Sequence, residues 1–587
     1  MKNLMKNNVK IATFLICCFI LITSCIKEDP KVDALITAPS SLIADATTTS
    51  LQFSLTTTRE WKITTSTDWI ASIDPSSSDN AVSNQTIEVT VSANTGDLRT
   101  GTITITSVDK THEIMVSQAA AAPAVVLGQV FLMKATVVKE SDGFNMLSDP
   151  GFEDYPNEDI GYFTPWWCAD SFYTTENPHS GKRACGLDLN NISSNLGFQT
   201  LAAKPHTEYV ITAYFKSNQD TGAPDTYLGI RKGSDRSVLK DVNKAPNFST
   251  TWSRESVEFN TENQSLIEAF AFAFQKEGYV VYWDDVKVTR KDDKQDTYTL
   301  KNIVKVGSVF DELNGLTSSD GCIGWISGEG KTFLAFGECI GVGDAKTSYN
   351  ALALSNNNNF QKDIASSLIK KDIVLPTAEG SCVPTAGVSV GNRQYIHYME
   401  STDKAFAEPL WTVTKSGIAY SDDGGNNWKV TDVEWGPQDN FAQVALLKED
   451  DYVYMYGTTA GRKIEEGEQY IKLARVPLEE MTTKSSWKYW NGNDWVDGVE
   501  NGVYIVYGGT IGEISVTKDS VSGRYLMVYK SEKRNAVVVR DAANPQGDWS
   551  GEKLVYTETG EILSVPSIIG LSNNNELYFL ISSAWGN

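Results

Sequence analysis

Hydrophobic and polar residues alternate in short runs along most of this chain. Leu51–Leu55, Ile87–Val91 and Gly101–Ile105 each place a small or apolar residue at every second position, which is the spacing of a strand with one buried face. Gly, Asn, Asp and Ser separate these runs, and stretches with a helical period are almost absent. The pattern predicts an all-β protein built from many short strands.

The chain of 587 residues is too long for one domain. Breaks in the alternation divide it, and the run Ala119–Pro123 has the composition of a linker. Five segments are predicted: a signal peptide at 1–24, a surface tether at 25–35, a β-sandwich at 36–121, a β-jelly roll at 143–292 and a C-terminal β-propeller of five or so blades at 300–587.

The N-terminus has the features of an export signal. Three lysines in the first ten residues precede the apolar run Ile11–Ile22, which is shorter than the roughly 20 residues of a membrane span. Small residues before Cys25 resemble a bacterial lipobox, which implies that Cys25 carries a lipid; an ordinary secretory signal is the alternative. Lys27–Asp29 resembles the surface-export signal of Bacteroidetes lipoproteins. Together these features predict lipid anchoring in the outer membrane with exposure at the cell surface.

Composition excludes several functional classes. A net charge of -23 and a pI near 4.7 argue against nucleic acid as a partner. Five cysteines beyond Cys25, without C-x-x-C spacing, form neither a zinc site nor a disulfide framework. His397 is the single histidine of the C-terminal half, and no G-x-S-x-G motif accompanies it. Abundant carboxylates favour acid–base chemistry by Asp and Glu, with no cofactor for catalysis.

The segment 36–121 carries a recognisable set of residues. Trp61, Trp69, Asn94, Arg99–Gly101 and Val116–Gln118 follow one another along it. This order resembles the BACON domain, a small sandwich found near the N-terminus of Bacteroidetes carbohydrate-active proteins. The resemblance implies a spacer, so the two tryptophans are predicted to lie in the core rather than to bind sugar.

The segment 143–292 contains Pro150–Glu153, Pro165–Trp167 and Tyr282–Val286 in that order. It resembles the jelly-roll carbohydrate-binding modules of the family 4 and 22 type. The resemblance implies polysaccharide as a partner and a structural calcium held by Glu153 and Asp285, because oxygen ligands suit this cation. Four aromatic residues are candidates either for stacking on sugar rings or for the core: Trp166, Trp167, Phe172 and Tyr173.

The last segment contains a marker of propeller blades. Ser421–Trp428 fits the Asp-box S-x-D-x-G-x-x-W, in which the Asp caps a hairpin turn and Gly supplies positive φ. Asn491–Trp495 is a less faithful copy. Strand pairs recur very roughly every 50 residues, which is compatible with blades. The Asp-box predicts the fold and no catalytic role.

Several patches of the same segment resemble the endo-D-arabinanase family of glycoside hydrolases. The patches are Thr317–Gly321, Lys331–Glu338, Val383–Gly387, Tyr395–Met399, Asn440–Val444, Tyr454–Arg462 and Ala474–Pro477. The resemblance implies cleavage of α-D-arabinofuranosyl links, as in mycobacterial arabinan, by two carboxylates of the first blade. Asp320 matches the first. Glu338 matches the second, although most members of that family have Asp there. The extra methylene moves the carboxylate by about 1 Å or more, which puts substrate identity and activity in doubt.

The chemistry of glycosidic bonds is consistent with such a pair. Hydrolysis needs one protonated carboxyl and one ionised carboxylate, and Asp320 and Glu338 lie on the two sides of one predicted hairpin. The alternative is that Asp320 is a turn residue and Glu338 is a solvent-exposed residue at the end of a strand. Further residues are candidates for binding substrate, with core or rim positions as the alternative: His397, Trp411, Gln443, Arg462 and Glu513.

The sequence therefore predicts a cell-surface, endo-acting glycoside hydrolase on a furanose polymer such as D-arabinan. The alternative is a non-catalytic surface glycan-binding protein of a polysaccharide-utilisation system, which the Asp-to-Glu difference at Glu338 keeps open. A sialidase is a less well supported alternative, because the propeller has one clear Asp-box and no evident arginine triad.

Overall fold

The structure is a computed structural model and is nearly all-β, as predicted. Apart from three short 3-10 turns at Leu478–Glu480, Lys484–Ser486 and Val499–Asn501, its described elements are strands. It describes residues 33–46, 48–94, 98–119, 128–141, 143–153, 165–168, 172–175, 177–190, 196–222, 224–243, 249–291, 295–311, 313, 315–341, 347–355, 360, 364, 366–377, 380–402, 412–458, 469–508, 511–532, 534–558, 563–571 and 574–583.

Within these ranges no helix has both the length and the apolar character needed to cross a membrane. The chain divides into two compact units, 1–124 and 125–587.

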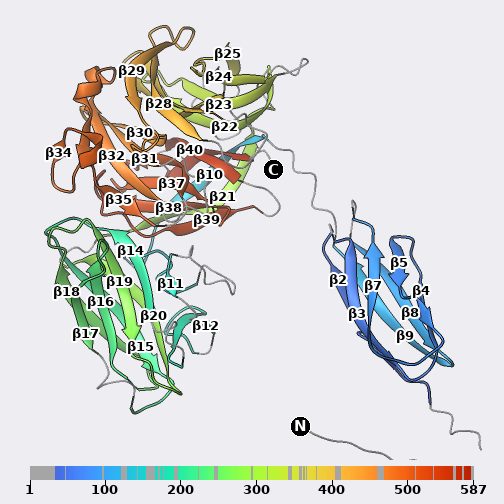
Figure 1. Cartoon of the computed structure of the whole chain (residues 1–587). Helices are drawn as coiled ribbons and strands as arrows, with labels where there is room; N and C mark the ends of the chain where they lie inside the picture. The colour runs from blue at the N-terminus through green and yellow to red at the C-terminus, as the bar shows by residue number, and fades with distance from the viewer. Residues whose placement is uncertain are drawn as a thin grey trace, which may run out of the picture. The chain divides into compact units, whose positions relative to one another are not determined.

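The first unit is a β-sandwich (Figure 1). One sheet contains β1 (Ile36–Thr37), β3 (Ser50–Thr57), β7 (Val82–Val91) and β5 (Ile70–Asp74). The other contains β2 (Ser41–Ala44), β9 (Lys110–Gln118), β8 (Arg99–Ser107), β4 (Trp61–Thr65) and β6 (Ser77–Ser78).

The residues that mark the sandwich in the sequence hold it together. Trp61 is buried in its core, as predicted, while Trp69 packs against the edge of that core with the Arg99 guanidinium 4.5 Å from its ring. Arg99 donates to Gln118 Oε1, and the Gln118 amide donates to three carbonyls of the segment 45–48. Asn94 donates to the Ala119 carbonyl at 2.7 Å. The motif therefore fixes the last strand to the loops that flank it.

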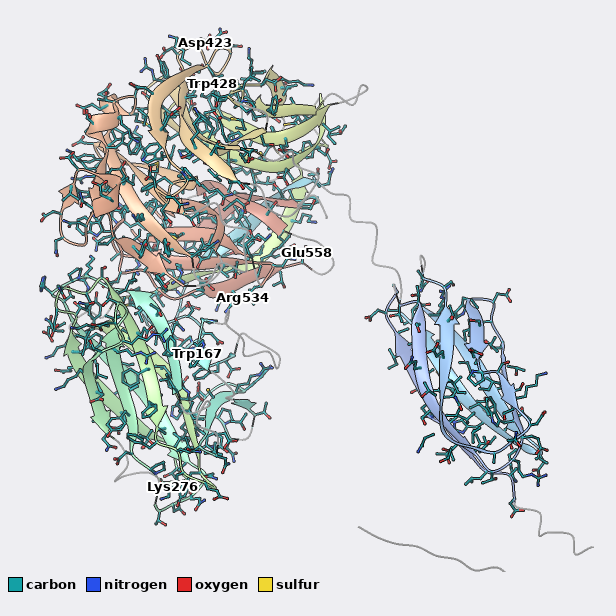
Figure 2. The ribbon with its side chains drawn as sticks, in the orientation of Figure 1. Trp167, Lys276, Asp423, Trp428, Arg534 and Glu558 are labelled. Atoms are coloured by element: carbon teal, nitrogen blue, oxygen red, sulfur yellow. The ribbon has the colours of Figure 1, made fainter. Side chains whose placement is uncertain are left out.

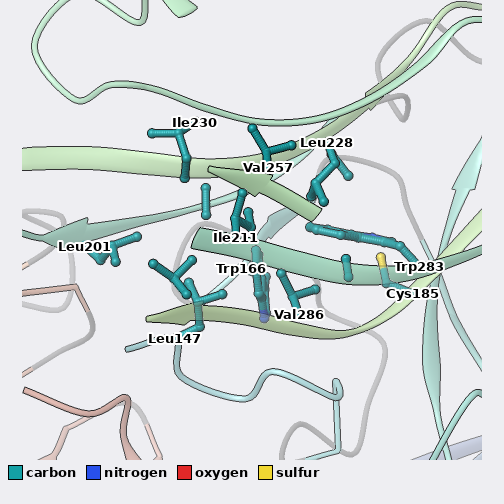
Figure 3. Packing of buried hydrophobic residues seen from close by; sticks show 14 of the residues in the cluster. Leu147, Trp166, Cys185, Leu201, Ile211, Leu228, Ile230, Val257, Trp283 and Val286 are labelled. Atoms are coloured by element: carbon teal, nitrogen blue, oxygen red, sulfur yellow. The ribbon is translucent and has the colours of Figure 1, made fainter. Parts of the chain in front are cut away.

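The jelly roll has two five-stranded sheets around one core. The first sheet contains β11 (Trp167–Cys168), β14 (Leu196–Ala202), β19 (Leu266–Ala273), β16 (Thr226–Lys232) and β17 (Val238–Asn243). The second contains β12 (Phe172–Thr174), β13 (Ala184–Asp188), β20 (Val280–Arg290), β15 (Glu208–Ser217) and β18 (Ser253–Asn260). Figure 3 shows Trp166 and Trp283 in this core, where their rings meet edge-on at 4.9 Å.

The propeller has five blades, each with an inner strand that contacts the inner strand of the next blade. Blades 1 and 2 contain β22 (Leu316–Ile326), β23 (Thr332–Gly341), β24 (Thr347–Ser355) and β25 (Ser367–Lys371), then β26 (Ser381–Val390), β27 (Arg393–Ser401), β28 (Val413–Ser421) and β29 (Lys429–Trp435). Blade 3 contains β30 (Gln443–Glu449), β31 (Tyr452–Thr458), β32 (Tyr470–Pro477), β33 (Lys488–Trp490), β34 (Trp495–Val496) and β35 (Tyr504–Tyr507). Blade 4 contains β36 (Ile511–Lys518), β37 (Tyr525–Ser531), β38 (Ala536–Ala542) and β39 (Lys553–Thr557).

Blade 5 combines strands from both ends of the second unit. From the inside outwards it contains β40 (Leu563–Leu571), β41 (Glu576–Ser583), β10 (Val130–Lys139) and β21 (Tyr298–Ser308). The jelly roll is therefore inserted between β10 and β21. The predicted propeller segment 300–587 lacks β10, because alternation shows that a strand exists but not which distant strand it pairs with.

Buried polar contacts join the jelly roll to the propeller. Asp548 accepts from Tyr209 Oη at 3.0 Å and from Arg290 Nε at 2.6 Å. Asp541 is fully buried and accepts from Arg524, from Lys553 at 3.0 Å and from Thr297 Oγ1 at 2.6 Å. Asp548 thus connects the jelly roll directly to the propeller, and Asp541 connects blade 4 to the segment that leads from β20 into β21.

We expect Asp541→Ala to lower the free energy of unfolding by about 3–5 kcal/mol, because it leaves the buried Arg524 and the partly buried Lys553 without their shared carboxylate. Denaturant titration of the mature chain measures this. The matched control is Asp497→Ala, whose carboxylate is 79% exposed and pairs with Lys488 at 2.5 Å; it is expected to cost less than about 1 kcal/mol. Equal losses in the two variants would contradict a stabilising role of the buried Asp541 carboxylate.

Candidate functional site

The five inner strands surround a central channel with two distinct ends. Their C-terminal halves line a cavity of about 370 Å³, so their first residues lie together at the opposite end, which we call the entrance end. Near these first residues the pairing register shifts in four of the five blades, between Leu316 and Ser318, Pro384 and Ala386, Ile511 and Ile514, and Ser564 and Ser567. Such bulges redirect side chains and are common beside active sites.

Asp320 and Glu338 lie opposite each other at the entrance end. In the β22–β23 hairpin Ser319 pairs with Cys339 and Gly321 with Gly337, which places Asp320 directly across from Glu338. Cross-strand neighbours have Cβ atoms about 4.5–5.5 Å apart. Glu338 has a backbone φ of +27°, which is uncommon for a residue with a side chain. The hairpin thus places the two predicted residues at neighbouring positions on adjacent strands.

Gln443 and Glu513 reach the same end from other blades. Gln443 is the first residue of β30 and is 5% exposed. Glu513 lies in the bulge of β36, and its Oε2 accepts from the Val565 N–H of the next blade at 3.3 Å. Polar residues of blades 1, 3 and 4 therefore lie at the entrance end of the channel.

His397 has a different environment from the one predicted. It is fully buried, its Nδ1 shares a hydrogen bond of 2.6 Å with Thr385 Oγ1, and its ring lies 5.9 Å from that of Trp435. Burial lowers the pKa of His397 to about 3, against a smaller opposing effect of a backbone hydrogen bond at Phe441. The predicted sugar contact is corrected to a neutral core residue, since a buried imidazole presents no surface to a sugar.

The remaining predicted substrate and lipid positions lie outside the described residues. These are Trp411, Arg462 and Cys25. Their roles stay predictions.

The predicted calcium ligands are engaged with protein groups. Glu153 Oε1 accepts from the backbone N–H groups of Lys182 and Arg183 at 2.7 and 2.9 Å. Asp285 is bonded to His179 Nδ1 at 2.5 Å and accepts from Ser180 Oγ at 2.8 Å. Among the described residues, no three His, Cys, Asp or Glu side chains gather as a metal-binding group. Calcium therefore stays a prediction that rests on the resemblance.

The jelly-roll aromatic residues divide between core and surface. Trp166 is fully buried, so the core alternative holds for it, while Trp167 is half-buried and lies 5.0 Å from Phe198 (Figures 2 and 3). The side chains of Phe172 and Tyr173 lie outside the described set.

Sequence reasoning missed an aromatic surface on the first jelly-roll sheet. Four residues of β19 pack in the jelly-roll core: Ile267, Ala269, Ala271 and Ala273. The residues between them, which include Phe270 and Phe272, therefore lie on the outer face of the sheet. The set that we call the aromatic face consists of Trp167, Phe198, Tyr227, Phe270, Phe272 and Phe274. Ring contacts of 5.2 Å (Phe272–Phe274) and 6.2 Å (Tyr227–Phe274) connect three of these rings. Phe198 and Phe270 are buried, and the Arg231 guanidinium lies 4.5 Å over the Phe198 ring. Aromatic residues at every second position from 270 to 274 were the available signal.

The Asp-box forms the predicted hairpin. Asp423 accepts from the Asn427 N–H at 2.9 Å and from Ser421 Oγ at 2.8 Å, and Gly424 and Gly425 have φ of +72° and +94°. These bonds, led by the Asn427 N–H, lower the pKa of Asp423 to about 2. Trp428 donates to the Gly425 carbonyl at 2.9 Å (Figure 2). The motif shapes a turn far from the carboxylate pair in sequence and serves the fold.

Residues 310–587 match the family model described as "Domain of unknown function (DUF4185)", and residues 59–119 match BACON, a "Putative binding domain, N-terminal". The chain therefore contains both domains, and the predicted BACON resemblance is confirmed.

Two curated relatives come from fungi. Notoamide biosynthesis cluster protein J of Aspergillus sp. (strain MF297-2) is 30% identical over 223 residues, which cover 35% of this chain and 57% of that protein. Protein J' of Aspergillus versicolor is 29% identical over 221 residues, with coverage of 35% and 58%. This chain thus spans less than two thirds of either relative.

Solved structures resemble parts of the fold. A GH43_1 enzyme from Xanthomonas citri is 11% identical with a TM-score of 0.30, covering 45% of this chain and 87% of that one. A structure titled "CBM4 structure and function" is 10% identical with a TM-score of 0.20, covering 25% and 99%.

The buried state of His397 predicts a measurable pH effect. The pKa of His397 is about 3 in the folded chain, against an ordinary value of 6.5. Below pH 6.5 the unfolded chain therefore binds a proton at this residue that the folded chain does not bind, so the free energy of unfolding falls as pH drops. Between pH 6.5 and 5 this amounts to about 2 kcal/mol. Denaturant titrations across this range should show that loss in wild type and not in His397→Gln. A control variant, His206→Gln at an exposed position, should behave as wild type; an unchanged slope in His397→Gln would contradict the assignment.

Proposed function

We propose that this protein is a cell-surface glycoside hydrolase that cuts a polysaccharide within its chain, with α-D-arabinofuranosyl polymers as substrate. The observation that carries the proposal is the position of Asp320 and Glu338 on adjacent strands at the entrance end of the propeller, between the register pairs Ser319–Cys339 and Gly321–Gly337. The DUF4185 match over 310–587 and the resemblance of this segment to endo-D-arabinanases support it.

The pair supplies what glycosidic cleavage needs. One carboxyl group donates its proton to the glycosidic oxygen as the bond to the anomeric carbon breaks. The other, ionised, either attacks that carbon or removes a proton from the attacking water. A separation of about 5–5.5 Å between the carboxyl groups gives retention, and one of about 6.5–9.5 Å gives inversion. Neighbouring positions on one hairpin are compatible with either role for each residue.

Other parts of the chain would hold the substrate. Gln443 at the entrance end offers an amide for sugar hydroxyl groups, and Arg462 and Trp411 would add contacts from their segments. The accessible rings of the aromatic face, Tyr227, Phe272 and Phe274, offer surfaces on which the apolar faces of sugars would stack. A lipid at Cys25 and the BACON sandwich would anchor and space the enzyme at the outer membrane.

A non-catalytic surface glycan-binding protein is the second candidate. The observation that favours it is Glu338, which has a φ of +27° and a longer side chain than the Asp that the family resemblance implies at this position. In that case the propeller would serve as a second binding platform beside the aromatic face.

We expect Asp320→Asn and Glu338→Gln each to reduce the release of arabino-oligosaccharides from mycobacterial arabinogalactan by about 10³-fold or more, because each removes one of two groups that act as a unit. Chromatography of the products measures this, with plant arabinan and xylan as comparison substrates. Glu329→Ala, an exposed surface position, is the matched control. Binding without release from any of these glycans would favour the second candidate.

We expect Phe274→Ala to weaken binding of the polymer by about threefold to tenfold, since one stacking contact contributes about 0.5–1.5 kcal/mol. Phe274 is 53% exposed, and Val430 on the propeller strand β29 is equally exposed at 53% and provides the control Val430→Ala. Affinity electrophoresis in gels that contain the glycan measures the difference. Equal retardation of both variants would exclude the aromatic face as the binding surface.

A further inference from the structure

Glu513 occupies a bulge that directs it away from its own blade. Gly512 and Glu513 together lie opposite Lys530, between the register pairs Ile511–Ser531 and Ile514–Tyr529. A Cβ atom at Gly512 would lie 2.7 Å from Glu532 Oε1, the end of a flexible side chain, and 3.2 Å from the Lys530 carbonyl oxygen, so the space at this position is tight. The extra residue breaks the ladder, which allows the Glu513 side chain to reach blade 5.

The group that Glu513 binds there has a strained backbone. Val565 has φ of +47° and lies in the bulge of β40. Positive φ is rare for a β-branched residue, and the following Pro566 restricts its conformation further. Its N–H is displaced from the regular ladder and donates to Glu513 Oε2 at 3.3 Å. A carboxylate is a strong acceptor for such a group.

Val565 in turn lies against the residue next to Asp320. A Cβ atom at Gly321 would lie 2.7 Å from Val565 Cγ2, so the valine side chain occupies the space beside the glycine. On the other side of Asp320, the Ser319 N–H donates to the Gly128 carbonyl at 2.8 Å. Asp320 therefore has a fixed neighbour on each side, and the contacts on one of them lead back to Glu513.

We propose that Glu513 is a positioning residue that sets the place of Asp320 through Val565 and Gly321. This inference rests on the proposed function, in which Asp320 is one of the two reacting groups. It differs from a direct sugar contact, because Glu513 acts through two backbone segments of other blades. A shift of about 1 Å in a reacting group can cost about 10²-fold in rate. If the Val565 backbone lost its hydrogen bond to Glu513, we would therefore expect kcat to fall while substrate binding stayed nearly the same.

Three variants separate positioning from sugar binding. Glu513→Gln keeps an oxygen that can accept from the Val565 N–H, and we expect its kcat to stay within about threefold of wild type. Glu513→Ala removes the acceptor, and we expect kcat to fall about tenfold or more while KM changes less than about twofold. Glu329→Ala again provides the surface control. Equal damage in Gln and Ala variants, together with a raised KM, would overturn the proposal in favour of direct sugar contact.

A second measurement does not depend on cleavage of any glycan. Amide hydrogen exchange followed by mass spectrometry should show faster exchange in peptides that contain Val565 and Gly321 in Glu513→Ala, and wild-type exchange in Glu513→Gln. Unchanged exchange in Glu513→Ala would overturn the proposal even if activity fell. If wild type cleaves no glycan, the proposed function fails, while the exchange rates still decide whether Glu513 holds this part of the channel mouth.

Discussion

The pairing of β10 with β41 is the interaction on which the rest of the second unit depends. Residues 130–136 pair in unbroken register with residues 576–582, and Met133, Ala135 and Phe579 are completely buried in the core that this creates. Without β10 the last blade would lose a central strand, and β21 would have no partner. The inner strand β40 contacts β22, where the ring closes, and β10 supports it through the intervening β41.

This closure also determines the surroundings of the carboxylate pair. The Gln129 amide donates to the Thr317 carbonyl at 3.2 Å, and the Gly128 carbonyl accepts the Ser319 N–H. The segment that enters the closing strand therefore supports the backbone around Asp320. Insertion of the jelly roll directly after this strand places a second potential glycan surface on the same compact unit, with buried carboxylates at the junction.

Local signals in the sequence were sufficient for the fold class and for individual turns. Alternation predicted the strands, and the Asp-box predicted the hairpin at Asp423 because its hydrogen bonds join residues close in sequence. Pairing over long distances leaves no such signal, so β10 was not assigned to the propeller. The cross-strand position of Asp320 and Glu338 was predicted because one hairpin contains both. His397 and Trp166 show the limit, since composition alone does not say whether a polar or aromatic side chain faces a channel or a core.

The position of β10 has a consequence for the order of events when the chain is made. More than 400 residues separate β10 from β41. Because the chain is synthesised at about 5–20 residues per second, β10 exists for roughly 20–90 s before its partner β41 is made. The jelly roll is completed in that interval, and it can fold while one end of the future propeller still lacks its neighbour. A strand edge that is still unpaired can form hydrogen bonds with the wrong strand. The slowest step in assembly is therefore expected to be the return of the last strand to one of the first.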